Sequence, residues 1–254
     1  MLLKTVRFWV VLTVLGLFLG CGQEKKGNIR IATAANMQFV MRELVKQFTS
    51  ETGIGCDVVV SSSGKLTNQI KAGAPYDIFV SADMTYPEEL YKKGLVHELP
   101  KVYAYGKLVL WSLYTMQTPS LKLLQESQIK HIAVTNPKTA PYGVAAMQVL
   151  DYYDLKKTLT NKLVFGESIS QTNQFIISKA AEIGFTAKSV VLSPLMRDKG
   201  KYIEIDEKAY DKIQQGIVRI KRGDSENKSA KAFYDFVLST EAQEILETFG
   251  YAAP

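Results

Sequence analysis

The segment Cys56–Ala82 reads CDVVVSSSGKLTNQIKAGAPYDIFVSA. It begins with a run of β-branched apolar residues that stops at three serines, a pattern typical of a buried strand. The run KLTNQIKAG then has the composition of a short helix, and DIFVSA that of a second strand. A strand, a helix and a strand in this order predict a parallel β-α-β unit whose helix covers one face of the sheet.

Two explanations fit the serines Ser61, Ser62 and Ser63, which stand where the strand ends and the helix begins. The first amide groups of a helix lack partners within the helix, and the helix dipole favours negative charge there, so the serines fit an anion site. A serine is also a usual residue for capping a helix N-terminus. This segment alone does not distinguish the two explanations.

The alternation of strands and helices continues on both sides of this segment. Before it, the chain has the pattern of a strand from Asn28 and of a helix that ends at Gly53. After it, a β-rich run, Val102–Ser112, leads into a second alternation, and Gln214–Ile220 is a strand that could cross back. We therefore predict an α/β protein of two lobes, each a mostly parallel sheet flanked by helices. Lobe 1 would comprise residues 28–107 and 216–254, and lobe 2 residues 108–215.

Residues 1–20 have the features of a signal peptide. A basic start precedes an apolar run of twelve residues, Phe8–Leu19, whereas a membrane-spanning helix needs about 20. Cys21 follows a small residue, and this arrangement resembles a bacterial lipoprotein signal, in which the cysteine is lipidated. We expect a periplasmic protein anchored to a membrane through Cys21, with residues 21–27 as a polar tether. The alternative is an ordinary signal peptide, after which Cys21 could form a disulfide with Cys56.

Composition and charge exclude several classes of partner. The chain has 254 residues, is 46% hydrophobic and carries a formal net charge of +6. Its basic residues are spread along the sequence without a stripe of interleaved aromatic residues, so we expect no nucleic-acid partner. The two histidines, His97 and His131, are far apart, and there is no H-x-H or C-x-x-C motif, so we expect no directly bound metal ion.

The sequence lacks the motifs of common enzymes. A phosphate-binding loop needs a glycine five residues before its Gly-Lys pair and a hydroxyl directly after it. Around Gly64-Lys65 those positions hold Val59 and Leu66. No G-x-S-x-G elbow of a serine hydrolase is present. We therefore expect a protein that is not an enzyme, with an exported hydrolase as the less favoured alternative.

Four strand–helix junctions carry small residues rich in hydrogen-bond donors. They stand at the carboxyl ends of strands, where open α/β sheets bind their ligands. The first two junctions have no arginine for a carboxylate, and the first three have no acid for the proton of phosphate, although Glu167 is at the fourth. A fully deprotonated tetrahedral oxyanion needs only donors, so it is the favoured ligand. The junctions are Ala34–Asn36, Ser61–Gly64, Pro141–Gly143 and Glu167–Ser170.

The stretch Ser61–Asp83 is similar to a motif of the periplasmic molybdate-binding proteins of molybdate ABC transporters, Q-I-x-A-G-A-P-x-D-[IL]-F-[IV]-S-A-D. The runs IRIATAANM, AVTNPKTAPYGVAA, GESIS and AFYDFVLSTEAQEILETFGY extend the resemblance over nearly all of residues 28–251. It implies a two-lobed periplasmic binding protein of type II that closes on molybdate or tungstate and uses no cofactor. It also implies an ABC permease of the inner membrane as partner, and we expect a monomer.

By position, the resemblance implies four ligands of the anion. Asn36 would donate its side-chain amide and its backbone N–H, and Ser63 its hydroxyl and its backbone N–H. Tyr142 and Ile169 would donate backbone N–H groups from the second lobe. Phe185 stands where many members of the family have a tyrosine, so one hydroxyl donor is missing.

Other cargoes and a purely structural role stay open at this point. A related protein could bind sulfate, phosphate or ferric iron, and Tyr152-Tyr153 could suggest an iron-binding pair. We expect these two tyrosines on a helix instead, with one ring buried and the other exposed. In a purely structural lipoprotein the serines would be caps only, but four similar junctions argue against that.

Overall fold

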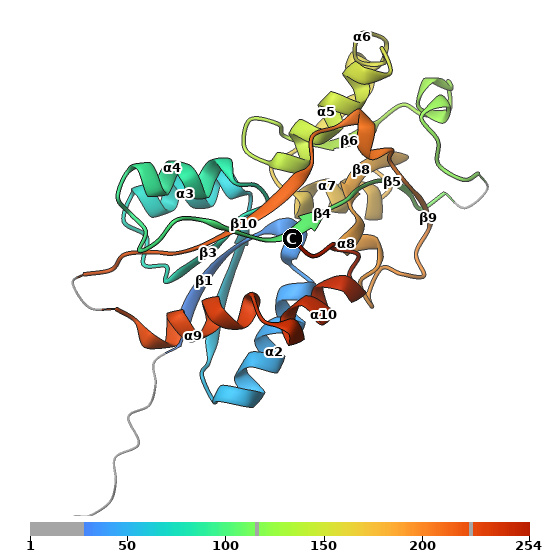
Figure 1. Cartoon of the computed structure of the whole chain (residues 1–254). Helices are drawn as coiled ribbons and strands as arrows, with labels where there is room; N and C mark the ends of the chain where they lie inside the picture. Colours follow the sequence, from blue (N-terminus) through green and yellow to red (C-terminus); the bar gives the residue numbers. More distant parts are fainter. Residues whose placement is uncertain (1–27, 115–116, 224–225) are drawn as a thin grey trace, which may run out of the picture.

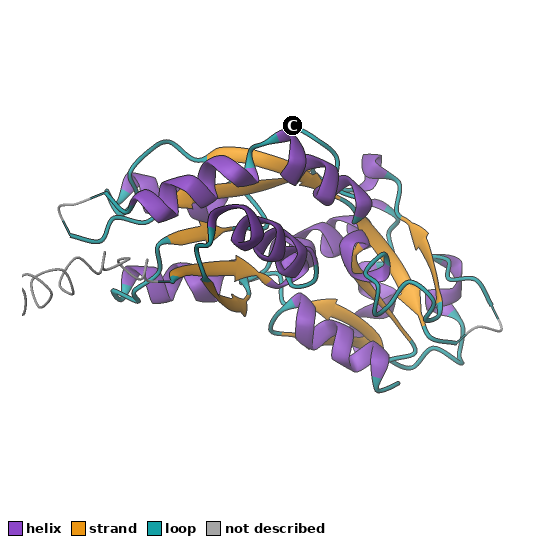
Figure 2. Ribbon diagram, turned by 90° about the horizontal axis from the view of Figure 1, so that it is seen from below, coloured by secondary structure: helices purple, strands orange, loops and turns teal. Residues whose placement is uncertain are grey.

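The computed structural model describes residues 28–114, 117–223 and 226–254. They form two α/β lobes, each built on a five-stranded sheet with helices around it (Figure 1, Figure 2). The predicted signal peptide, the predicted lipidation of Cys21 and the tether lie outside the described residues. Within the three ranges, no helix is both long enough and apolar enough to cross a membrane.

The first lobe contains β1 (Ile29–Ala34), β2 (Cys56–Ser61), β3 (Ile78–Val80), β4 (Lys101–Gly106) and β10 (Ile213–Arg219). Their order in the sheet is β2-β1-β3-β10-β4. β1 is parallel to β2 and β3, whereas β10 is antiparallel to both of its neighbours. Four of the five strands therefore point the same way.

Helices cover both faces of this sheet because the side chains of its strands alternate between two apolar clusters. On β1, Ile31 packs with α2 (Val40–Thr52), while Ala32 packs on the opposite face. Phe48 of α2 meets Phe233 edge-to-face, with ring centroids 5.1 Å apart. The helices α9 (Lys228–Val237) and α10 (Thr240–Thr248) lie on the face of α2, and α3 (Ser63–Lys71) and α4 (Thr85–Lys92) lie on the other.

The second lobe repeats this arrangement. Its strands are β5 (Leu108–Ser112), β6 (Ile132–Thr135), β7 (Leu163–Gly166), β8 (Ile183–Ala187) and β9 (Lys201–Glu204). The order is β7-β6-β8-β5-β9, with β6 parallel to β7 and β8, and β5 antiparallel to β8 and β9. Again four strands point the same way, so the prediction of mostly parallel sheets is confirmed for both lobes.

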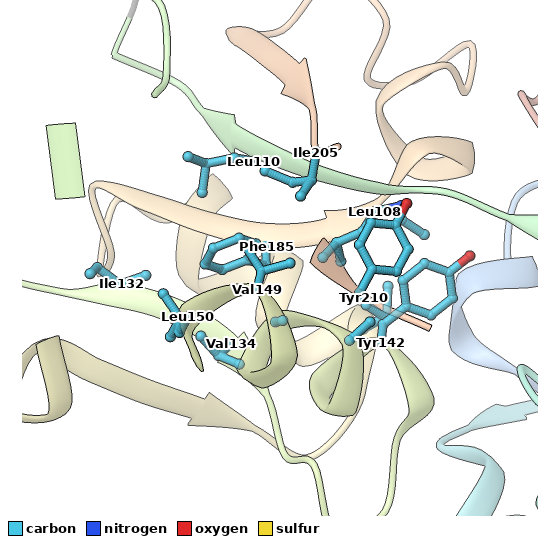
Figure 3. Close-up of a cluster of buried hydrophobic side chains, with 14 of the residues drawn as sticks. Leu108, Leu110, Ile132, Val134, Tyr142, Val149, Leu150, Phe185, Ile205 and Tyr210 are labelled. Atoms are coloured by element: carbon cyan, nitrogen blue, oxygen red, sulfur yellow. The ribbon is translucent and has the colours of Figure 1, made fainter. Parts of the chain in front are cut away.

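The helices of the second lobe are α5 (Pro141–Tyr152), α6 (Lys156–Leu159), α7 (Ile169–Ile177) and α8 (Lys188–Val191). Figure 3 shows Phe185 of β8 and Val149 of α5 in the apolar cluster on one face of the sheet. Trp111 of β5 lies in the cluster on the opposite face, with Ile176 of α7. Short 3-10 helices complete the fold: η2 (Ala35–Met37), η3 (Lys122–Gln125), η4 (Thr160–Lys162) and η5 (Glu207–Ala209).

Two strand connections join the lobes (Figure 1). In the first, Lys107 alone separates β4 from β5, which is where the predicted boundary falls. In the second, β10 already pairs with β4 at Ile213, opposite Gly106, so the predicted boundary between residues 215 and 216 falls inside this strand. The apolar run of β10 gave no sign of where its pairing with the first sheet begins.

Two details differ from the predictions. β2 is not buried: Val58, Val59 and Val60 are 38%, 39% and 38% exposed, because β2 is the edge strand of its sheet. Tyr152 and Tyr153 are both exposed, because α5 ends at Tyr152 and both rings lie past the part of the helix that packs on the sheet. Their rings pack edge-to-face against each other.

Candidate functional site

The four predicted junctions lie together where the lobes meet. In the first lobe Ala34 and Ser61, at the ends of β1 and β2, are paired neighbours. In the second lobe Thr135 and Gly166 are paired in the same way at the ends of β6 and β7. Each junction is thus beside the other junction of its own lobe.

Contacts across the interface join the two pairs. The backbone N–H of Gly64, in the first turn of α3, donates to the carbonyl of Thr139 just before α5, at 2.9 Å. The hydroxyl of Ser170, at the start of α7, donates to the side-chain carbonyl of Gln38, just after η2, at 2.5 Å. These contacts show the lobes in a closed arrangement, in which each junction region of the first lobe meets one of the second lobe.

All four predicted residues begin a helix and are buried. Asn36 belongs to η2, Ser63 and Ile169 are the first residues of α3 and α7, and Tyr142 is the second residue of α5. Their exposed fractions are between 1% and 3%. Among the described residues, none of their backbone N–H groups has a hydrogen-bond acceptor. The first N–H groups of a helix have no acceptor within that helix, so these four groups are candidate donors to a ligand.

Ser63 is held in a position that leaves its hydroxyl proton available. Its Oγ accepts the backbone N–H of Ala82 at 3.0 Å, so the hydroxyl has its own proton to donate. Ser63 does not cap its helix. Ser62 occupies the N-cap position, and its side chain makes no capping hydrogen bond.

The side-chain amide of Asn36 is engaged within the protein. Its Nδ2 donates to Oε1 of Gln215 at 2.7 Å and to the hydroxyl of Tyr251 at 2.8 Å. Both amide hydrogens are therefore used in this closed arrangement, and the backbone N–H is the donor that Asn36 retains for a ligand. This differs from the expectation that the amide also contacts the anion.

The charge balance at the site comes mainly from backbone dipoles. Lys65 and Glu167 form a cross-lobe ion pair at 3.0 Å, and both side chains are about half exposed. The hydrogen bond from Lys65 lowers the pKa of the Glu167 carboxyl below its ordinary value. Since the two charges neutralise each other, attraction for an anion rests on helix N-termini and unpaired N–H groups.

Other features of the site region provide no further ligand-binding group. Phe185 is buried in the apolar cluster of the second lobe, so this position provides no hydroxyl (Figure 3). A cavity of about 280 Å³ between the lobes is lined by Asp83, Pro141 and Lys212 among others. None of the four predicted ligand residues, Asn36, Ser63, Tyr142 and Ile169, lines it. Across the described ranges, no three His, Cys, Asp or Glu side chains are grouped so that they could hold a metal ion.

Three residues around Asn36 were missed by the sequence interpretation: Ser189, Gln215 and Tyr251. Gln215 is completely buried on β10, where the pairing with β4 shifts register next to Gly216. The one signal in the sequence was a pair of glutamines followed by a glycine inside an apolar strand pattern. No local sequence pattern distinguishes Ser189 or Tyr251 from other serines and tyrosines of the chain.

Two α/β lobes that close around unpaired backbone donors define the architecture of a solute-binding protein. The bacterial extracellular solute-binding protein family matches residues 29–252, and the chain belongs to this family.

Individual relatives of the chain have more specific names than the family. The molybdate-binding protein ModA of Azotobacter vinelandii is 36% identical over 226 residues, covering 88% of this chain and 89% of that protein. The protein of the same name from Rhodobacter capsulatus is 35% identical and covers 89% of this chain and 88% of its own length. The solved structure of the Azotobacter vinelandii periplasmic molybdate-binding protein superimposes with a TM-score of 0.85 at 32% identity, covering 89% of this chain and 100% of that one. The predicted resemblance and the predicted two-lobed fold are confirmed.

Proposed function

We propose that this protein captures molybdate or tungstate between its lobes and delivers the ion to an ABC permease in the inner membrane. The observation that carries the proposal is the set of four buried, unpaired backbone N–H groups, two from each lobe. The ModA relatives, which are 36% and 35% identical to this chain over the aligned residues, support the choice of ion. The protein acts as a carrier and not as an enzyme.

The chemistry of the donors favours a fully deprotonated oxyanion. Backbone N–H groups and the Ser63 hydroxyl can donate, and no lysine or arginine stands among the four junctions to bind the ion too tightly for release. Phosphate, which keeps a proton near neutral pH, is disfavoured because the donors do not accept it. Sulfate remains the closest alternative, since it has the charge and shape of molybdate but a smaller size.

The place of action follows from the same proposal. An exported protein that meets oxyanions outside the cytoplasm would work in the periplasm, held at the membrane by a lipid on Cys21. One copy with two lobes provides all four donors, so a monomer suffices. Incorporation of a radiolabelled lipid precursor into the protein would test the anchor. We expect Cys21→Ser to abolish this incorporation.

Titration calorimetry of the mature protein with molybdate, tungstate, sulfate and phosphate tests the cargo. We expect tight one-to-one binding of molybdate or tungstate and no heat from the other two ions. Trp111 is a weak reporter for this purpose, because it is buried in the second lobe with its indole N–H bonded to the carbonyl of Lys199. If sulfate bound as tightly as molybdate, the proposed cargo would be wrong.

Ser63→Ala should weaken molybdate binding by roughly 1.5–3 kcal/mol, the usual contribution of a hydrogen bond to a charged group. The comparison variant is Ser62→Ala, because the Oγ of Ser62 is also buried and has no hydrogen-bond partner among the described residues, which makes Ser62 the competing donor. If Ser63 is the donor, we expect Ser62→Ala to bind within about threefold of wild type, since about 0.6 kcal/mol corresponds to that ratio. If Ser62→Ala weakened molybdate binding and Ser63→Ala did not, the assignment of the donor to Ser63 would be wrong.

A further inference from the structure

A closed ring of three hydrogen bonds lies behind the ligand site. The amide Nδ2 of Asn36 donates to the hydroxyl of Tyr251 at 2.8 Å, and the Tyr251 hydroxyl lies 3.1 Å from Oγ of Ser189. The Ser189 hydroxyl in turn donates to the backbone carbonyl of Asn36 at 2.8 Å. The ring uses one proton from each residue and returns to the residue where it began.

The direction of these bonds is fixed by Gln215. Its Nε2 donates to the carbonyl of Ala82 at 3.1 Å, so its Oε1 must face Asn36. Asn36 therefore presents Nδ2, and not Oδ1, to both Gln215 and Tyr251. Burial raises the pKa of Tyr251 to about 12, so its hydroxyl keeps its proton at physiological pH.

The ring joins three segments that are remote in sequence and belong to different lobes. Asn36 and Tyr251 are in the first lobe, next to β1 and after α10, whereas Ser189 is on α8 of the second lobe. Their exposed fractions are 1%, 4% and 3%. When the lobes separate, Ser189 must leave the ring, because it is the one member from the second lobe.

A second acceptor for the Tyr251 proton is already in place. The Tyr251 hydroxyl lies 3.2 Å from the carbonyl of Asn36, the same atom that accepts the Ser189 hydroxyl. In the open form Tyr251 can donate directly to this carbonyl, and in the closed form it can donate to Ser189. The backbone carbonyl of Asn36 is thus hydrogen-bonded in both states, so opening does not leave this carbonyl without a donor.

We propose that Ser189 and Tyr251 are positioning residues for anion retention: they form a hydrogen-bonded latch that holds Asn36 only when the lobes are closed. Ser189 supplies the bond across the interface, and Tyr251 orients the Ser189 hydroxyl towards the Asn36 carbonyl. The latch slows opening and therefore the release of the ion. It rests on the proposed function, because the ion is what selects the closed state.

Stopped-flow dissociation of molybdate from the full mature protein tests the latch. Ser189→Ala should raise the dissociation rate roughly tenfold, which is the effect expected from losing one neutral hydrogen bond. The association rate should not change. The melting temperature of the ligand-free protein should not change, because the latch forms only when the lobes close on the ion. A merely structural serine would instead lower the melting temperature of the ligand-free and the bound protein alike.

Tyr251→Phe and a double variant test the coupling within the ring. Tyr251→Phe should also speed release, and Ser189→Ala added to it should speed release no further, because the ring is already broken. Ser193→Ala is the matched control: its hydroxyl is buried and bonds the carbonyl of Val190 within the second lobe at 2.7 Å. It should lower the melting temperature and leave the dissociation rate unchanged.

The possible outcomes separate the latch from the proposed function. If wild type bound neither molybdate nor tungstate, the proposed function would be wrong and the latch would lose its basis. If wild type bound molybdate and Ser189→Ala released it at the wild-type rate, the latch alone would be wrong. Additive effects of Ser189→Ala and Tyr251→Phe would likewise contradict a closed ring.

Discussion

Asn36→Asp should strongly weaken the binding of molybdate and tungstate at neutral pH. The new carboxylate would lie at a buried position, 1% exposed, beside a doubly charged anion. Two unit charges about 4 Å apart repel by about 4 kcal/mol at an effective dielectric constant of about 20. This corresponds to a loss of affinity of about a thousandfold, measured by calorimetry.

The pH dependence of this variant gives a second test. Burial and the bound anion both raise the pKa of the new carboxyl, so it becomes neutral as the pH falls through that raised value. Affinity should then recover in part below this pH, whereas wild type should show no such step. Asn36→Leu, which has nearly the same size and no charge, is the control, and it should lose much less affinity. Equal losses in the two variants would mean that lost contacts within the protein, and not charge, weaken binding.

Gly64→Leu should prevent the lobes from closing while leaving the first lobe folded. A Cβ atom at Gly64 would lie 2.8 Å from the hydroxyl of Tyr86, at the end of a side chain that can turn aside. It would lie 3.1 Å from both Cα and the carbonyl oxygen of Thr139, which are backbone atoms of the other lobe. Overpacking of this kind costs about 1–3 kcal/mol even before the rest of the leucine is placed. We expect at least a tenfold to hundredfold loss of molybdate affinity.

Gly64→Leu should slightly raise the stability of the ligand-free protein while it lowers the affinity for molybdate. Gly64 has no positive φ and lies in α3, where glycine is less favourable than leucine by several tenths of a kcal/mol. Asn68→Leu places the same side chain on an exposed position of the same helix and is the matched control. It should bind like wild type, and a Gly64→Leu variant that also bound like wild type would contradict the closed arrangement described here.

The sequence was sufficient for those features that depend on local pattern. Strands that end in small polar residues before a helix predicted where Ser63, Tyr142 and Ile169 stand, because strand ends and helix starts leave a periodicity that can be read. The exposure of Val58–Val60 could not be read, since the same valine run fits a central or an edge strand. The order of strands in the sheet decides between them, and that order is a property of the whole chain.

The hydrogen-bond partners of Asn36 could not be predicted from the sequence either. Its amide meets Gln215 and Tyr251 across 179 and 215 residues of chain. The Ser63 hydroxyl similarly accepts from Ala82, which lies beyond a full helix and strand. No spacing rule links residues so far apart, so which donors remain free for the ion becomes visible only in three dimensions.

The equal strand order of the two sheets has a consequence for the shape of the cargo. β1 and β2 of one lobe correspond to β6 and β7 of the other, so Asn36 corresponds to Tyr142, and Ser63 to Ile169. In each lobe one donor follows the middle strand of three parallel strands, and the other follows the edge strand beside it. The four donors therefore come as two matched pairs, one pair from each lobe. The four corners of a tetrahedron also divide into two equivalent pairs, so two like lobes suit a tetrahedral ion.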